Sequence, residues 1–125
     1  MTQQINQGAL PHGNQATAIG SAILGAGTTD LGTVPAGKIW RIFAFQVTLS
    51  VANDGNSAFA QFLLDGSSLC PCICADTAAG ELDSNGATIN LSGEDAIYLS
   101  AGKKVQGQVS KGRGGFTFFY QEVPA

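Results

Sequence analysis

Apolar and polar residues alternate along one long segment of this chain, residues 38–51. Apolar side chains occupy its odd positions from Ile39 onwards, with Arg41 as the interruption. A period of two residues is that of a β-strand, in which successive side chains point to opposite faces of a sheet. Trp40 and Ile42 occupy even positions. We therefore expect the beginning of this strand to be covered on both faces and the remainder to be half-buried.

Eight further segments have the length and composition of strands, and Gly, Pro, Asn and Asp separate them. They are residues 19–24, 28–31, 57–64, 67–74, 87–91, 96–99, 103–110 and 116–123. Asp65-Gly66 is a typical two-residue hairpin turn, and Pro71 places the strand after it at a sheet edge, because proline cannot donate to a ladder. No segment has a helical period. The pattern predicts an all-β fold, an antiparallel β-sandwich or barrel.

The first 18 residues are different, because they are rich in Gln, Asn, Gly and Ala and have almost no apolar period. Ordering a backbone costs about 1–2 kcal/mol per residue, which such a composition cannot offset by itself. We predict an extended N-terminal arm over residues 1–18 and a β-sandwich domain over residues 19–125. The arm is expected to lie across a neighbouring subunit, and the alternative is that it folds back along its own sandwich. The candidate interface residues in it and at its end are Ile5, Leu10, Pro11 and Ile19.

The composition of the 125 residues limits the possible partners. Charged residues make up 12% of the chain and the net charge is −3. An acidic chain lacks the basic face that nucleic-acid binding needs, and no apolar run is long enough to span a membrane, so neither partner is expected. The N-terminal residues have no signal-peptide pattern, so we expect synthesis in the cytoplasm of a host cell.

Catalytic motifs are absent or incomplete. His12 is the only histidine and lies in the arm, which nearly excludes a Ser–His–Asp or Cys–His site. Residues 32–38 match the G-x-x-x-x-G-K pattern of a phosphate-binding loop, but Ile39 stands where Ser or Thr would hold magnesium. Loop carboxylates could form a glycosidase pair or a calcium site, although we favour solvated side chains. These carboxylates are Asp76, Glu81, Asp83, Glu94 and Asp95. We expect no enzymatic activity, no cofactor and no metal.

Three cysteines, Cys70, Cys72 and Cys74, stand at alternate positions of one predicted strand. They would point to one face about 7 Å apart, too far for neighbours to form an undistorted disulfide. We interpret them as buried structural thiols. A metal site or a contact between subunits near a symmetry axis is the open alternative.

Trp40 and Arg41 are further candidate interface residues. Near the strand end the Arg41 guanidinium can reach water, or it can pair with a carboxylate of its own or a neighbouring subunit. Trp40 and Ile42 in one strand, and Phe119 and Val123 in another, place apolar side chains on the second face of a sheet. A sandwich buries one face of each sheet, so these side chains need other cover, and we predict self-association.

The C-terminal third resembles a known family. It consists of residues 97–105 (IYLSAGKKV), residues 106–110, a Gly-rich turn and an aromatic strand with FTFFY at 116–120. This arrangement is similar to the closing strands of trimeric jelly rolls, the tumour-necrosis-factor-like and complement-like heads. Residues 34–38 (VPAGK) before a long strand also resemble β-sandwich proteins of tailed bacteriophage particles. The resemblance implies a jelly-roll-like sandwich, a homotrimer and a place in a virion.

From these features we expect a virion structural protein, a capsid decoration (cement) protein that binds between neighbouring shell subunits. Its partners would be further copies of itself and the major capsid protein or other virion proteins. The alternative is a tail-fibre or receptor-binding domain that recognises a cell-surface glycan through acidic, Asn-rich loops. A hydrolase that uses loop carboxylates is a third hypothesis.

Overall fold

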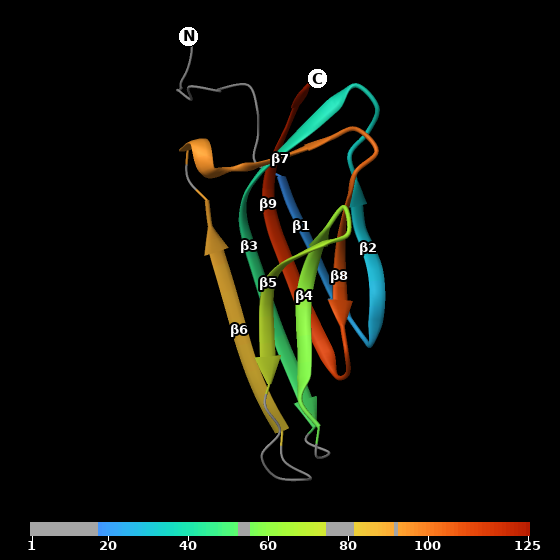
Figure 1. Ribbon diagram of the computed structural model, residues 1–125, viewed down its shortest axis with the longest axis vertical. Helices are drawn as coiled ribbons and strands as arrows, with labels where there is room; N and C mark the ends of the chain where they lie inside the picture. The colour runs from blue at the N-terminus through green and yellow to red at the C-terminus, as the bar shows by residue number, and fades with distance from the viewer. Residues whose placement is uncertain (1–17, 53–55, 75–81, 92) are drawn as a thin grey trace.

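The computed structural model describes residues 18–52, 56–74, 82–91 and 93–125, and these residues form nine strands and one short 3-10 turn (Figure 1). The strands are β1 (Ala18–Leu24), β2 (Gly27–Thr33), β3 (Lys38–Ala52), β4 (Ala58–Leu64), β5 (Ser67–Cys74), β6 (Leu82–Asn90), β7 (Ile97–Ser100), β8 (Lys104–Val109) and β9 (Arg113–Pro124), with the turn η1 (Gly93–Asp95) before β7. Among the described residues, no helix is long and apolar enough to cross a membrane. Residues 1–17 of the predicted arm, with Ile5, Leu10 and Pro11, lie outside the described residues, and its last residue, Ala18, begins β1.

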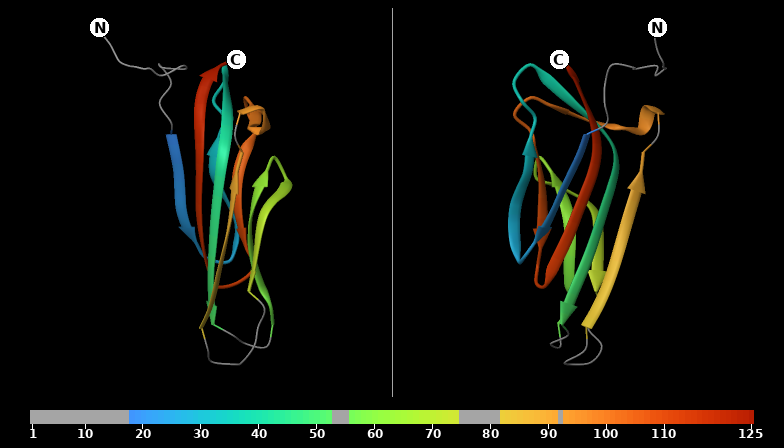
Figure 2. Two further views of the ribbon diagram at one scale, coloured as in Figure 1. Left: turned by 90° about the vertical axis from the view of Figure 1, so that its left-hand side faces the viewer. Right: turned by 180° about the vertical axis from the view of Figure 1, so that it is seen from behind.

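The strands form two antiparallel sheets that lie face to face as two layers (Figures 1 and 2). The first sheet has the order β1-β9-β3-β6, and β7 also pairs with β3. The second sheet has the order β2-β8-β4-β5. The last strand thus lies between the first and the third, and neighbours in the sequence often lie in different sheets, as in a jelly roll. The prediction of an antiparallel, jelly-roll-like β-sandwich is confirmed.

The hairpin between β4 and β5 has the geometry that its sequence predicts. Asp65 and Gly66 both have a positive φ, 49° and 90°. Two-residue hairpin turns of this kind require positive φ at both central positions, which Asp-Gly accepts at low cost. The hairpin places β5, which contains Pro71, at the edge of the second sheet, as predicted.

The core between the sheets is built around Phe62 of β4, whose side chain is fully buried. Its ring centroid lies 5.0 Å from that of Phe45 and 5.2 Å from that of Phe116, both in edge-to-face geometry. Phe118 lies at 6.2 Å, also edge-to-face. Such pairs add about 0.5–1.5 kcal/mol each beyond the burial of area. This aromatic cluster joins β4 of one sheet to β3 and β9 of the other.

One prediction for β3 is wrong. Trp40 and Ile42 do not lie on the second face of the sheet but are buried in the core, 5% and 0% exposed. The cause is a β-bulge in the pairing of β3 with β9, where the register shifts between Ile42 and Ala44. One extra residue in a strand reverses which face the following side chains occupy. The side chains before the bulge therefore point inward at even positions, and those after it, from Phe45 on, at odd positions.

The sixth strand also begins earlier than predicted, at Leu82 rather than at residue 87. Residues 82–86 have the composition of a turn, yet they pair in regular register with the end of β3, from Asp83 opposite Val51 to Gly86 opposite Thr48. The long neighbouring strand provides hydrogen-bond partners, and this pairing outweighs the weak local preference.

Candidate interaction surface

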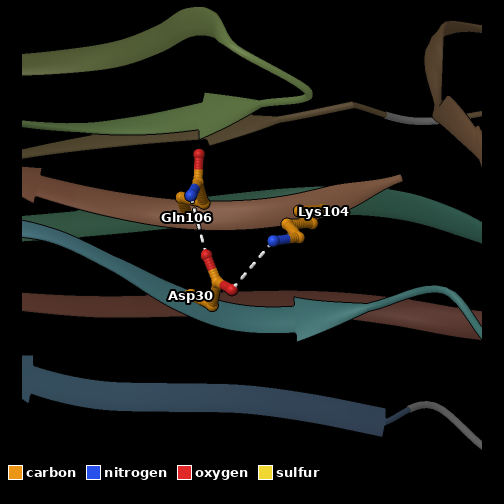
Figure 3. Close-up of polar contacts among 3 residues, drawn as sticks. All are labelled: Asp30, Lys104 and Gln106. Carbon is orange, nitrogen blue, oxygen red and sulfur yellow. Dashed lines mark hydrogen bonds and ion pairs between the residues drawn. The ribbon is translucent and has the colours of Figure 1, made fainter. Parts of the chain in front are cut away.

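The two outer faces of the sandwich differ in chemistry. On the outer face of the sheet β2-β8-β4-β5, the Asp30 carboxylate accepts hydrogen bonds from Gln106 Nε2 at 2.7 Å and from Lys104 Nζ at 3.2 Å (Figure 3). The bond from Gln106, followed by that from Lys104, lowers the pKa of Asp30 below its usual value. Next to this group, Gln61 Nε2 donates to Gln108 Oε1 at 2.7 Å. The polar side chains of this face thus bind one another across β2, β8 and β4.

The outer face of the five-stranded sheet combines a group of apolar side chains with polar ones, such as Gln46, Thr48 and Ser50 in the second half of β3. Three large apolar side chains near β9 and the start of β3 are strongly exposed on it: Ile19 at 61%, Ile23 at 74% and Tyr98 at 58%. Leu82, 84% exposed, lies apart from them on the opposite edge strand, β6. Phe43 and Phe119 are half-buried on this face, with ring centroids 6.5 Å apart. We call this surface the apolar face; its members are Ile19, Ile23, Ile39, Phe43, Tyr98, Phe119 and Val123.

The strand register brings these side chains together. Phe119 of β9 lies opposite Ile19 of β1. Further along β9, Val123 lies opposite Ile39 of β3. The members come from four strands, β1, β9, β3 and β7, and only the pairing of these strands makes them neighbours. Exposed apolar patches of this kind mark contact surfaces in soluble proteins.

Arg41 lies on the apolar face and is half-buried. Its Nη1 donates to Gln121 Oε1 at 3.3 Å, and its guanidinium carbon lies 5.7 Å from the centroid of the Phe43 ring. Tyr98 is its partner in the register with β7. The guanidinium therefore lies against an aromatic ring of its own strand, and the two arrangements expected from the sequence stay predictions.

The predicted interface residues have different positions. Ile19 lies at the surface, and Arg41 lies on the same face with β9 between their strands, so their interface role stays a prediction. The prediction that Trp40 is an interface residue is wrong, because its indole is in the core and its Nε1 donates to Glu122 Oε1 at 3.0 Å. The sequence analysis missed Ile23 and Phe43. The spacing of Ile19 and Ile23 on either side of Ser21 could have indicated that Ile23 is exposed. The position of Phe43 depends on the bulge in β3, which the sequence does not mark.

The three cysteines are free and buried, each 2% exposed, as the spacing predicted. Cys74 Sγ lies 3.8 Å from the carbonyl oxygen of Leu49 in β3, to which it can donate a weak hydrogen bond. Burial is the first cause that raises the pKa of each thiol. These properties are those of unreactive structural thiols.

Within the described residues, no three His, Cys, Asp or Glu side chains are placed so that they could hold a metal ion. Of the loop carboxylates, Asp83 lies in β6 and Glu94 and Asp95 lie in η1. Asp76, Glu81 and His12 fall outside the described residues.

Comparison with known proteins adds to the description of the fold. No family model and no curated protein matches the chain. A solved structure of Eiger TNF from S. frugiperda superposes with a TM-score of 0.50 at 11% identity, and the match covers 89% of this chain and 92% of that chain. The fold is that of a jelly roll. The capsid asymmetric unit of the cyanophage Pam1 matches at a TM-score of 0.45 and 13% identity, over 96% of this chain and 93% of that chain. The first likeness shows the jelly-roll fold alone, and the second is too distant to add to it.

Proposed function

We propose that this jelly roll is a structural protein of a virus particle, a decoration protein that binds to the assembled capsid through its apolar face. The observation that carries the proposal is the contrast between the two outer faces. One face has exposed Ile19, Ile23 and Tyr98, and the other has a polar network around Asp30 with Ile73 as the only large apolar side chain described there that is strongly exposed. The low charge of the chain, 12% of residues, fits a surface that neighbours cover.

A decoration protein needs no catalytic group. It stabilises the shell by mass action, because it binds the assembled state and not the free subunits. At a free concentration of about 100 Kd, each occupied site gains about 2.7 kcal/mol. We therefore propose a non-enzymatic role, with the major capsid protein or another virion protein as partner.

A homotrimer is part of the proposal. Phe119 and Val123 lie on the apolar face, as the sequence predicted. Their position supports the proposal that further copies of the chain cover this face. The argument from Trp40 and Ile42 no longer applies, because both are in the core. Light scattering at micromolar concentration tests this point: a particle of three times the 12.8 kDa chain mass is expected, and a monomer would contradict the trimer.

The alternative is a fibre or receptor-binding domain that recognises a glycan. Exposed Tyr98 beside Arg41 and Gln121 favours it, because an aromatic ring with polar neighbours offers both stacking and hydrogen bonds. Of the acidic loop that the sequence predicts at residues 75–85, residues 75–81 lie outside the described residues and residues 82–85 belong to β6.

Two matched variants test the decoration role. Ile19 and Ile73 are isoleucines with nearly equal exposure, 61% and 58%, but Ile73 belongs to β5 in the other sheet. Burying an isoleucine contributes about 1.5–3 kcal/mol, so Ile19→Lys should weaken binding to purified capsids of the encoding virus by at least about tenfold. Ile73→Lys should bind like the wild type.

Equal loss in both variants, or no binding of the wild type to capsids, would contradict the proposal. Binding of the wild type to a glycan array but not to capsids would support the fibre alternative instead. Circular dichroism of both variants checks that the sandwich remains folded.

A further inference from the structure

Among the described residues, each sheet has two edge strands. They are β1 and β6 in the first sheet and β2 and β5 in the second. An edge strand has N–H and C=O groups without a partner in its own sheet, and stable proteins protect such edges with proline, charges, bulges or cover. The four edges can therefore be compared by the protection that each one has.

Three of the edges are protected. β5 contains Pro71 and a bulge, and its Ile73 carbonyl accepts a hydrogen bond from Asn85 Nδ2 of β6 at 2.8 Å. That bond ties the β6 edge to the β5 edge, and β6 also has the charge of Asp83. β2 has the charged Asp30 and a register shift directly after it.

Within the part of the chain that the structure describes, the edge of β1 has no proline, charge or bulge and no pairing strand beyond β9. Its seven residues include no proline and no charge, and its register with β9 is unbroken from Ala18 to Leu24. Figure 2 shows the strand beside β9, where it ends the first sheet. Two of its side chains, Ile19 and Ile23, are among the most exposed large apolar residues described. A straight, uncharged and apolar edge is the type that pairs with another strand.

We propose that β1 pairs antiparallel with β1 of a second copy, on a twofold axis through Ser21. The residue types of the strand are arranged symmetrically about Ser21, because an isoleucine, Ile19 or Ile23, lies two positions away on each side. In this register Ile19 of each copy lies opposite Ile23 of the other, and the two Ser21 side chains face each other. A twofold contact requires such self-complementarity, since the same patch serves both partners.

The pairing covers what the monomer exposes. All four isoleucines lie on one face of the joined sheet, because residues 19, 21 and 23 share a face in a strand. Opposed side chains in an antiparallel pair have Cβ atoms about 4.5–5.5 Å apart, within contact distance for isoleucine. Although each chain has a net charge of −3, the uncharged β1 places no like charges opposite one another. The absence of like-charge repulsion therefore favours contact at this edge over the edges with Asp30 or Asp83.

The contact is small. Each copy contributes the seven residues of β1, whereas a standard interface has roughly 20–30 residues on each side. We therefore expect weak, concentration-dependent dimers. Within a particle, this contact would link neighbouring copies that the capsid already holds close together. The inference does not rest on the decoration role, because it follows from the edge itself.

Cysteine variants test both the pairing and its register. Ser21→Cys should form a disulfide-linked dimer under mild oxidation, because the two new thiols face each other on the twofold axis. Ile19→Cys alone and Ile23→Cys alone should not cross-link, because each new thiol lies opposite an isoleucine. An equal mixture of these two variants should cross-link as a heterodimer. The wild type, whose own cysteines are buried, is the control.

Absence of a cross-link in Ser21→Cys, or self-linking of Ile19→Cys at the same rate, would overturn the proposed pairing. A second pair of variants needs no cysteine. Ser21→Asp places two carboxylates opposite each other and should lower the dimer fraction in sedimentation at high concentration, whereas the uncharged Ser21→Asn should not. Equal behaviour of these two variants would also count against the twofold contact.

Discussion

Replacing Gly20 with alanine tests how β1 is attached to the sandwich. Gly20 lies in β1 with its α-carbon over the buried ring of Phe118. An added Cβ would come within 2.3 Å of Phe118 Cε1 and 2.4 Å of Cζ, much closer than van der Waals contact. Phe118 in turn packs against Phe62 and Trp40, with ring centroids 6.2 Å away in both cases, which limits its ability to move.

The expected magnitude combines two opposing effects. Overpacking a dense core costs typically about 1–3 kcal/mol. Replacing Gly by Ala also stabilises by about 0.4–1 kcal/mol, because the unfolded chain loses conformational freedom. The net expectation for Gly20→Ala is a free energy of unfolding lower by about 1–2 kcal/mol. For a domain of this size that lowers Tm by roughly 3–10 °C.

Gly25→Ala is the matched control. It lies directly after β1, and no described atom lies within 4 Å of the Cβ that alanine would add. Only the effect on the unfolded chain remains, so this variant should equal or slightly exceed the wild type in stability. Urea unfolding of the three proteins at one fixed concentration measures the difference. If Gly20→Ala is as stable as Gly25→Ala, then β1 does not pack over Phe118 as described. A second change, Phe118→Leu, should restore part of the loss in a double-mutant cycle.

Three further predictions concern the core, one surface carboxylate and the thiols. Phe62→Ala should lower the free energy of unfolding by about 3–5 kcal/mol, whereas Phe59→Ala, which is only half-buried, should cost clearly less; equal losses in urea unfolding would refute the central role of the Phe62 ring. The folded-state pKa of Asp30 lies below its unfolded value of about 3.8, so its contribution to stability is present above that pH and is lost as the pH falls through the folded pKa. Lys104→Ala should raise this pKa in an NMR titration, and an unchanged value would contradict the contact. The three cysteines should react slowly with a thiol reagent in the native protein and fast in denaturant, and fast native labelling would show that they are not buried.

Several features of the fold could be predicted from local patterns of residues in the sequence. The alternation over residues 38–51 predicted the longest strand, and Asp65-Gly66 predicted the tight hairpin. Pro71 predicted the edge position of β5, because a residue without an N–H cannot serve in the middle of a ladder. The spacing of the three cysteines predicted that they share one face, and burial confirmed it. These features depend on the residue and its immediate neighbours, so one sequence was enough to predict them.

Tertiary structure decided which side chains lie at the surface. The bulge in β3 places Trp40 in the core and Phe43 on the outer face. It lies within the uninterrupted apolar run of residues 42–45, where no local pattern marks it. Pairing with β3 also extended β6 back to Leu82 through residues that favour a turn. The apolar face and the unprotected edge of β1 arise from strands far apart in the sequence, so they became visible only when the sheet order was known. Long-range hydrogen-bonded pairing sets register and sheet edges, and a single sequence does not show which strands will pair.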